Sequence, residues 1–191
     1  MKKLGNNLLL MLVIVAVVGG LAYNYYYKKQ LAHEEADTAP QELLADRDLA
    51  RQRPDFTLPD RIGLPHAVNE WDGKTLIVNF WATWCPPCRR ELPMLNTIQQ
   101  RYAQQGVQVV AIALDDRQAV DGFIKATGIQ LDLQVLVGND DAIPVAKAYG
   151  NETGLLPYTV IVDSRGMIRY SHFGAIEESD LKEQLRRLLT G

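Results

Sequence analysis

The sequence predicts an α/β sandwich in which helices cover both faces of a mixed β-sheet. From residue 55 onward, short apolar runs rich in β-branched residues alternate with amphipathic segments of helical period. Two such β-α-β passes are followed by a strong hairpin turn and a closing amphipathic helix. The 191 residues, 47% hydrophobic and 23% charged, suit one globular domain with additional segments. The net charge of −3, with no basic stripe, argues against a nucleic-acid partner.

The beginning of the chain predicts a single transmembrane helix. Residues 5–27 carry no charge, and about 20 predominantly apolar residues span the hydrocarbon core of a bilayer. The tyrosines at the end of this run, followed by Lys28 and Lys29, suit the membrane interface. A cleaved signal peptide is the alternative, because residues 20–22, Gly-Leu-Ala, resemble a cleavage site. The lysines on the two sides of the run balance, so charge leaves the orientation open.

Composition divides the chain into three parts. Residues 1–29 are the expected membrane anchor or uncleaved signal, residues 30–53 form a polar spacer, and residues 54–191 form the folded domain. Within the domain, we expect residues 55–69 to add a hairpin ahead of the main sheet.

The first strand and helix of the sheet surround the cysteines. Residues 75–80 form an apolar run that is typical of a central strand covered on both faces. Residues 86–105 predict a helix, because their apolar side chains recur on one stripe and Gly106 follows as a stop signal.

The second β-α-β pass follows directly. Residues 107–114 predict a buried strand, and residues 131–137 predict the next one. Between them lies the expected helix 116–127, and Asp115 and Asp116 are expected only to begin that helix.

The last part of the chain predicts a short helix, a hairpin and a closing helix. The short helix covers residues 141–149. Strands at 158–162 and 167–173 flank the turn sequence Asp-Ser-Arg-Gly, which is a hairpin signal. Ser179 is expected to cap the final amphipathic helix.

The two cysteines, Cys85 and Cys88, indicate redox chemistry. A pair so close in the chain cross-links almost nothing, so its purpose is chemical. The strand-to-helix context places Cys85 at a helix N-terminus, where backbone N–H groups and the helix dipole favour a thiolate. The thiolate is the attacking species in disulfide exchange. We therefore expect Cys85 to be the nucleophile and Cys88, one turn on, to resolve the mixed disulfide.

Pro86 and Pro87 indicate the direction of exchange. Both lie in the first turn of the expected helix, where a missing N–H costs least. Each proline also removes a donor that could stabilise the Cys85 thiolate. Because a less stable reduced form makes a stronger reductant, we predict a reductase rather than an oxidase.

Three other interpretations of the cysteine pair stay open. The pair could be half of a zinc site, but tetrahedral zinc needs two more ligands, and His33, His66 and His172 are scattered along the chain. Two soft thiolates could also deliver copper, or the pair could be a purely structural disulfide. Our main expectation includes no metal or other cofactor, only the redox-active disulfide.

Longer motifs around the cysteines resemble the thioredoxin superfamily. They are VNFWATWCPPCRRELP at residues 78–93, VAKAYG at 145–150 and LPYTVIVD at 156–163. More narrowly, the chain resembles the membrane-anchored TlpA/ResA-type thiol–disulfide oxidoreductases, which are relatives of the cytochrome c maturation thioredoxins. The resemblance covers residues 54–189 and implies a thioredoxin-like three-layer sandwich with a mixed central sheet.

The resemblance implies further site residues. Pro157 matches the family's cis-proline, which lies beside the disulfide and helps to present backbone to the substrate. Glu91 matches an acidic residue that could accept or relay a proton, although an ordinary glutamate in a first helical turn is the alternative. Thioredoxin itself has a buried aspartate where this chain has Asn79, which strengthens the case for Glu91. Trp81 and Trp84 could shield the disulfide or contact a partner, with core packing as the alternative for Trp81.

The expected function is a protein disulfide reductase outside the cytosol. The resemblance implies disulfide-containing protein substrates, apocytochrome c among them, and a membrane dithiol transporter as electron donor. A tethered reductase is useful where disulfides form, so we expect a single-pass protein of the inner (cytoplasmic) membrane whose C-terminal domain faces the periplasm or cell exterior. A copper-delivery module and a peroxiredoxin-like peroxidase are the alternatives. The peroxidase would need a peroxidatic cysteine in a threonine-rich loop, which this sequence lacks.

Overall fold

The structure is a computed structural model, and it describes residues 19–20, 23–24 and 51–190. The two short stretches near the beginning are helical. Most of the expected membrane anchor and nearly all of the expected spacer lie outside the described residues. Within the described ranges, no helix is both long and apolar enough to cross a membrane. The contacts divide the chain into Met1–Leu44 and Ala45–Gly191, and the second unit holds the sheet.

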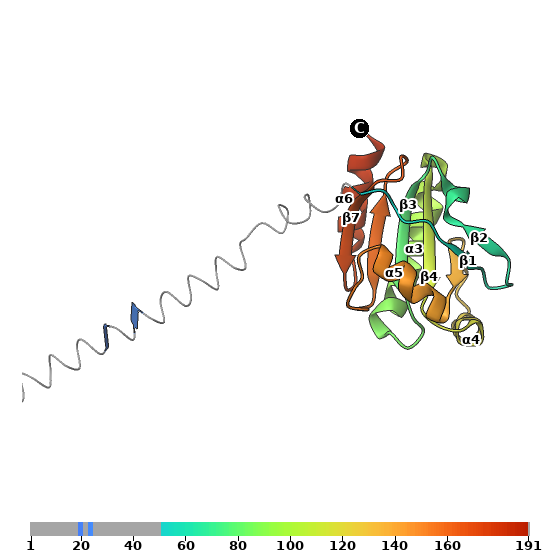
Figure 1. The fold of residues 1–191 in the computed structure, drawn as a ribbon, viewed down its shortest axis with the longest axis horizontal. Helices are drawn as coiled ribbons and strands as arrows, with labels where there is room; N and C mark the ends of the chain where they lie inside the picture. The colour runs from blue at the N-terminus through green and yellow to red at the C-terminus, as the bar shows by residue number, and fades with distance from the viewer. Residues whose placement is uncertain (1–18, 21–22, 25–50, 191) are drawn as a thin grey trace, which may run out of the picture. The chain divides into compact units, whose positions relative to one another are not determined.

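Five strands form the central sheet: β3 (Thr75–Trp81), β4 (Val107–Ala113), β5 (Gln134–Val137), β6 (Tyr158–Val162) and β7 (Ile168–Phe173). Their order across the sheet is β5-β4-β3-β6-β7 (Figure 1). The first three strands run parallel, whereas β6 is antiparallel to β3 and β7 is antiparallel to β6. The predicted mixed sheet is therefore confirmed.

The α-helices of this unit cover both faces of the sheet: α3 (Pro86–Tyr102), α4 (Arg117–Thr127), α5 (Ala142–Ala148) and α6 (Glu178–Leu189). Helices α3, α4 and α6 bury apolar side chains against one face, where Ile77 and Trp81 of β3 point. Helix α5 packs on the other face with Leu76, Val78 and Phe80. Alternate residues of β3 thus enter two separate core layers, which explains its uninterrupted apolar sequence.

The expected hairpin ahead of the sheet is present. Strands β1 (Thr57–Pro59) and β2 (Pro65–Ala67) pair antiparallel, and the 3₁₀ helix η1 (Val68–Trp71) follows them. Apolar side chains of this segment join the core on the α5 face. Two more 3₁₀ turns, η2 (Ala103–Gln105) and η3 (Asn139–Asp141), extend α3 and precede α5.

One predicted helix start is confirmed at Asp116, and another differs from the sequence prediction. Helix α4 is capped by Asp116, whose carboxylate accepts a hydrogen bond from Ala119 N–H at 2.8 Å, which leaves Asp115 for another contact. Helix α6 begins at Glu178, and its N-cap residue makes no side-chain hydrogen bond. The expected cap by Ser179 is therefore wrong. Acidic side chains in the first turn provide the favourable charge there instead.

The described domain begins at the end of the sheet far from the cysteines. Arg53 N–H donates to Gly166 O at 2.8 Å, so residues 51–53, which the sequence predicts to be part of the spacer, contact the β6–β7 turn. Val162 at the end of β6 pairs with Leu76 at the start of β3. The cysteines follow the opposite end of β3, so the two features lie at opposite ends of the sheet.

Candidate active site

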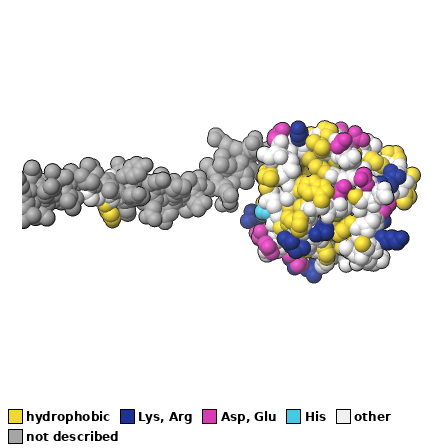
Figure 2. All heavy atoms as spheres, turned by 90° about the horizontal axis from the view of Figure 1, so that it is seen from below, with side chains coloured by type: hydrophobic (Ala, Val, Ile, Leu, Met, Phe, Trp, Pro, Cys, Tyr) yellow, Lys and Arg dark blue, Asp and Glu magenta, His cyan; other side chains and the backbone are white. Residues whose placement is uncertain are grey.

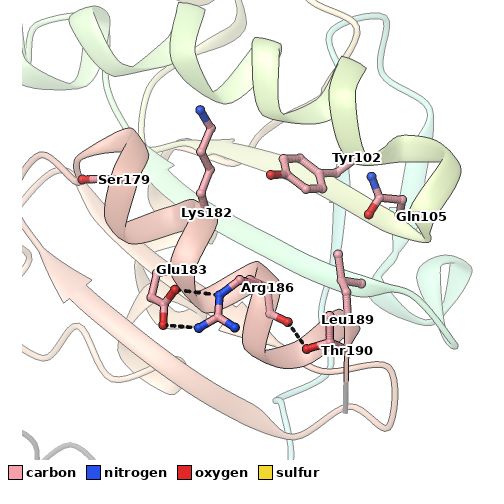
Figure 3. Close-up of a pocket in the computed structure, with 8 residues that line it drawn as sticks. All are labelled: Tyr102, Gln105, Ser179, Lys182, Glu183, Arg186, Leu189 and Thr190. Atoms are coloured by element: carbon pink, nitrogen blue, oxygen red, sulfur yellow. Dashed lines mark hydrogen bonds and ion pairs between the residues drawn. The ribbon is translucent and has the colours of Figure 1, made fainter.

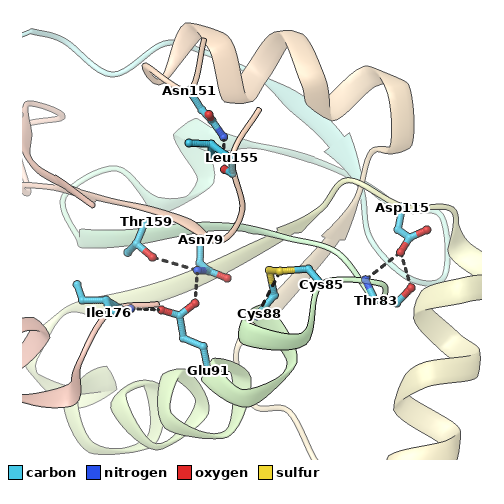
Figure 4. Close-up of a disulfide and its surroundings, with 10 residues drawn as sticks. All are labelled: Asn79, Thr83, Cys85, Cys88, Glu91, Asp115, Asn151, Leu155, Thr159 and Ile176. Carbon is cyan, nitrogen blue, oxygen red and sulfur yellow. Dashed lines mark hydrogen bonds between the residues drawn. A yellow bond between two sulfur atoms is a disulfide. The ribbon is translucent and has the colours of Figure 1, made fainter. Parts of the chain in front are cut away.

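Both cysteines lie at the junction of β3 and α3. Figure 4 shows the disulfide between Cys85 and Cys88, with an S–S distance of 2.02 Å and a Cα–Cα distance of 5.3 Å. Cys85 is the N-cap residue of α3, and Pro86 begins the helix as the sequence predicted. Cys88 N–H donates to the Cys85 sulfur at 3.3 Å. The sulfur of Cys85 therefore occupies the place of a capping oxygen.

The start of α3 has few backbone donors near the disulfide. Pro86 and Pro87 have no N–H, so the N–H of Cys88 is the first donor of the helix. Both cysteines are nearly buried in this oxidised state, Cys85 with 4% and Cys88 with 1% of its surface exposed. Once the pair is reduced, the helix N-terminus favours negative charge on Cys85, but through fewer hydrogen bonds than a proline-free turn would offer.

Glu91 lies on the Cys88 side of the disulfide and points into the protein (Figure 4). Its side chain is buried, with 5% of the residue exposed. One carboxyl oxygen accepts a hydrogen bond from Ile176 N–H at 2.9 Å, and the other accepts one from Asn79 Nδ2 at 3.1 Å. Ile176 lies 85 residues later, between β7 and α6. The tertiary fold thus encloses a carboxyl group one helical turn from Cys88.

The surroundings of Glu91 favour its protonated form. Burial raises the pKa of Glu91 above the usual value of a glutamate, because the charged form loses its water. The hydrogen bonds from Ile176 and Asn79 lower the pKa, but desolvation is the larger effect. Glu91 therefore keeps its proton to a higher pH than an exposed glutamate, which suits a group that accepts and returns a proton.

Asn79 and Thr159 form a polar pair beneath α3. They lie directly opposite each other on β3 and β6, and both are buried. Asn79 Nδ2 donates to Thr159 Oγ1 at 3.0 Å as well as to Glu91. Among the described residues, Asn79 Oδ1 has no hydrogen-bond partner. A rotation of this amide would turn Oδ1 toward a protonated Glu91. Asn79 can therefore hydrogen-bond to Glu91 in both its charged and its protonated form.

Pro157 precedes β6 at the same end of the sheet as the cysteines. The peptide bond between Leu156 and Pro157 is cis, as the family resemblance implied. The register of β3 and β6 places Pro157 beside the end of β3, where the cysteine turn begins. Asn151, which is fully buried, donates from Nδ2 to Leu155 O at 2.8 Å and so holds the preceding loop (Figure 4).

Asp115 contacts the cysteine turn from the end of β4 (Figure 4). Its Oδ2 accepts hydrogen bonds from Thr83 N–H at 2.9 Å and from Thr83 Oγ1 at 2.5 Å. The expectation that Asp115 only begins a helix is therefore wrong. No local pattern links these two residues, which are 32 positions apart and meet because the ends of β3 and β4 coincide. For the same reason, the sequence did not predict the hydrogen bonds of Glu91 or the hydrogen bond between Asn79 and Thr159.

The two tryptophans beside the cysteines have different surroundings. Trp81 is fully buried, and its ring centroid lies 5.7 Å from that of Phe123, so it belongs to the core. Trp84 is 67% exposed, and Leu155 in the loop before Pro157 is 60% exposed. Trp84 directly precedes Cys85, Leu155 lies two residues before Pro157, and exposed apolar side chains suit contact with a protein. On the face drawn in Figure 2, apolar side chains lie between interspersed acidic and basic ones.

A surface hollow of about 380 Å³ lies at the other end of α3 (Figure 3). Tyr102 and Lys182 are among its lining residues, and the charged Glu183 and Arg186 in its wall bond to each other at 2.8 and 2.9 Å. The 17 residues of α3 separate this hollow from Cys85 by about 25 Å at the usual helical rise. It is therefore remote from the disulfide.

The described residues hold no group of three or more His, Cys, Asp or Glu side chains that could bind a metal ion. His66 instead contacts Glu70 at 2.8 Å and Asp60 at 3.4 Å on the β1–β2 hairpin. His33 lies outside the described residues. The two cysteine sulfurs are bonded to each other, so the zinc interpretation gains no support from the described part of the chain.

The order of the strands, the helices on both faces and a disulfide capping the first long helix define a thioredoxin-fold thiol–disulfide oxidoreductase. Comparison with known proteins agrees with this class. Residues 50–185 match the Redoxin family, and the chain belongs to that family.

Individual relatives show which members of the family the chain is similar to. The thiol-disulfide oxidoreductase ResA of Geobacillus thermodenitrificans is 33% identical over 136 residues, which are 71% of this chain and 75% of the relative. ResA of Halalkalibacterium halodurans is 32% identical over 145 residues, covering 74% and 79%. A solved thiol:disulfide interchange protein of the thioredoxin family from Chlorobium tepidum has a TM-score of 0.62 at 28% identity, covering 73% of this chain and 97% of its own. StoA from Bacillus subtilis has a TM-score of 0.56 at 25% identity, covering 70% and 97%. The resemblance to the TlpA/ResA type is confirmed.

Proposed function

We propose that this oxidoreductase works as a reductase of disulfides in extracytoplasmic proteins, through a dithiol/disulfide cycle of Cys85 and Cys88. The observation that carries the direction is the pair Pro86 and Pro87 at the start of α3, which leaves the N–H of Cys88 as the first donor to the Cys85 sulfur. With fewer donors the Cys85 thiolate is less stable. A less stable reduced form gives up its electrons more readily.

The cycle begins with the Cys85 thiolate attacking a substrate disulfide. A mixed disulfide forms, and one substrate thiolate leaves. Cys88 then loses its proton and attacks the Cys85 sulfur, which breaks the mixed disulfide, releases the second substrate thiolate and forms the Cys85–Cys88 disulfide. Two electrons pass to the substrate, and its two thiolates take up protons. A membrane dithiol donor returns two electrons by the reverse exchange and becomes a disulfide itself. The cycle uses no bound cofactor.

Glu91 accepts the proton of Cys88 in this proposal. Its position one turn beyond Cys88, its burial and its raised pKa support this role, because a base with a raised pKa removes a thiol proton more readily than an ordinary carboxylate. Asn79 would then rotate to offer Oδ1 to the protonated carboxyl group.

Pro157 presents extended backbone to the substrate in this proposal. Its place beside the end of β3 supports that role. Trp84 and Leu155, both exposed, would add apolar contacts to the disulfide-containing protein, for which apocytochrome c or another extracytoplasmic thiol protein is our candidate.

We further propose that the protein is a single-pass protein of the inner membrane. Residues 1–29 would be the anchor in the lipid bilayer or an uncleaved signal, residues 30–53 the spacer, and residues 54–191 the domain facing the periplasm or cell exterior. The uncharged run 5–27 and the need for a reductase where disulfides form support this location. Alkaline phosphatase fused to the C-terminus should be active, and activity of a cytosolic reporter there instead would contradict the proposal.

The reduction potential of the cysteine pair tests the direction of exchange. The full chain is equilibrated with dithiothreitol or glutathione buffers, and the fluorescence of Trp84, next to Cys85, reports the redox state. A potential near about −270 mV or lower supports the reductase, because thioredoxin lies there. A potential near about −120 mV, as in strong oxidants, would mean that the protein makes disulfides.

A further inference from the structure

The turn that presents Cys85 is tied to the sheet through Thr83. Cys85 N–H donates to Ala82 O at 3.2 Å, which closes the turn around Thr83 and Trp84. Trp84 points outward and is 67% exposed, so packing of its side chain does little to hold the turn. Thr83 donates both its backbone N–H and its hydroxyl to one oxygen of Asp115, at 2.9 and 2.5 Å. A change in the position of Asp115 therefore moves Thr83, and only Trp84 separates Thr83 from Cys85 in the chain.

Asp115 is itself held in place. Leu114 N–H donates to Trp81 O at 2.8 Å, which prolongs the pairing of β3 and β4 to the residue before Asp115. The second carboxylate oxygen, Oδ1, lies 3.2 Å from the N–H of Asp116. Every hydrogen-bond partner of this side chain among the described residues is a donor, so the position is suited to an acceptor group on a fixed piece of backbone.

Asp115 also places a negative charge on the Cys85 side of the disulfide (Figure 4). A nearby negative charge opposes formation of a thiolate. The reduced pair is then less stable and donates electrons more readily. The charged residues next to the cysteines and Asp115 in the chain are Arg89, Arg90 and Glu91 on α3, followed by Asp116 and Arg117 at the start of α4, and all of them except Glu91 are exposed.

We propose that Asp115 is a positioning residue of the redox site with two effects on Cys85. Through Thr83 it fixes the turn that presents the sulfur, and through its charge it keeps the Cys85 thiolate scarce and the pair reducing. This inference rests on the proposed cycle of Cys85 and Cys88. It is independent of Glu91, which lies on the other side of the disulfide.

The variant Asp115→Asn separates the effect of the Asp115 charge from its effect on the position of the turn. The amide keeps an oxygen for both Thr83 bonds and loses the charge. Asp116→Asn is the matched control, because it removes the charge of the neighbouring residue, leaves Thr83 untouched and keeps a good N-cap for α4. The full chain is reduced, and two quantities are measured: the pH profile of Cys85 alkylation by iodoacetamide, and the equilibrium constant with glutathione.

We expect Asp115→Asn to raise the alkylation rate about 3-fold on the acid side of the profile and to shift the equilibrium about 3-fold toward the reduced form. Asp116→Asn should change both quantities much less, because its carboxylate is exposed to water. If Asp115→Asn matches Asp116→Asn in both quantities, the charge effect is overturned. If the wild-type pair does not exchange with glutathione at all, the proposed cycle fails and this inference fails with it.

Thr83→Val tests the geometric effect. Valine keeps the shape, the backbone bond and the charge of Asp115, and it removes only the hydroxyl bond. We expect the equilibrium with glutathione to stay close to wild type, whereas the backbone amide NMR signals of residues 82–85 shift and reduction of insulin slows about 3-fold. Unchanged signals and an unchanged rate would overturn the positioning role.

Discussion

The two sides of the disulfide each have a carboxyl group, and the protein surrounds the two groups differently. On the Cys88 side, Glu91 is buried and its pKa is raised by desolvation. On the Cys85 side, Asp115 is half-buried and accepts two hydrogen bonds from Thr83. The first group is held by donors from distant parts of the chain, and the second by the turn that carries the cysteine.

In the proposed cycle, the difference follows from what each sulfur does. There Cys88 meets no external partner and loses its proton in a buried site, with 1% of the residue exposed. A buried carboxyl group with a raised pKa suits that site. Cys85 has to meet the substrate at the surface, so its side of the motif needs a fixed position more than a proton acceptor. In these proposals a carboxyl group takes part in proton transfer where it is buried, and fixes the position of a turn where it is only half-buried.

Substitution of either cysteine should have the largest effect on activity, and the two substitutions should differ in where the reaction stops. Cys85→Ser should abolish reduction of insulin, because the attacking sulfur is gone. Cys88→Ser should still attack but stop at the mixed disulfide, because nothing can displace the substrate from Cys85. Non-reducing electrophoresis and mass spectrometry of the trapped species distinguish the two variants. An active Cys85→Ser protein would show that Cys88 starts the reaction and would reverse the assignment.

Glu91→Gln should have the next largest effect. Loss of the proton acceptor should slow resolution of the mixed disulfide roughly 10²-fold, the lower part of the range for general acid–base catalysis. The slowing should disappear at high pH, where hydroxide removes the Cys88 proton. Stopped-flow fluorescence of a preformed mixed disulfide measures this step. Glu178→Gln, in an exposed ion pair with Lys182, is the control, and equal rates for the two variants would remove Glu91 from the mechanism.

A smaller effect is expected from Thr159→Val. The valine cannot accept the hydrogen bond from Asn79, which leaves the buried amide less well satisfied. We expect a loss of about 1 kcal/mol in the free energy of unfolding, measured by urea denaturation. Thr97→Val on α3, where the exposed hydroxyl bonds only to the backbone of Pro93, should cost less. A Thr159→Val protein as stable as wild type would mean that this polar pair contributes nothing to stability.

The smallest expected effect is a pH dependence of stability that originates at Glu91. Because the folded-state pKa is raised, the folded protein keeps a proton that the unfolded chain has already lost above about pH 4.3. The unfolded state then binds fewer protons, so this group makes stability fall as the pH rises through that window. The difference in unfolding free energy between wild type and Glu91→Gln, measured across this pH range, gives the contribution of Glu91 to the pH dependence. A difference that grows in favour of wild type with rising pH would contradict the raised pKa.

Local patterns predicted most of the secondary structure and the position of the cysteines. The apolar run of β3, the stripe of α3 and the turn between β6 and β7 are each contained within a few residues. The start of α3 at Pro86 follows from proline chemistry, which is equally local. The prediction of a cap at Ser179 was wrong because Glu177 is the N-cap of α6, and a two-residue shift of a helix start changes which side chain reaches the N–H groups.

The sequence by itself determined that a Cys-Pro-Pro-Cys pair begins a helix after a buried strand, and this context is enough to indicate disulfide exchange. Only the tertiary structure decided that Glu91 meets the N–H of Ile176, that Asn79 faces Thr159, and that Asp115 holds Thr83. The physical reason is that these contacts depend on which strands are neighbours and in what register. Strand order is settled by packing both faces of the whole sheet, and no short stretch of sequence contains that information.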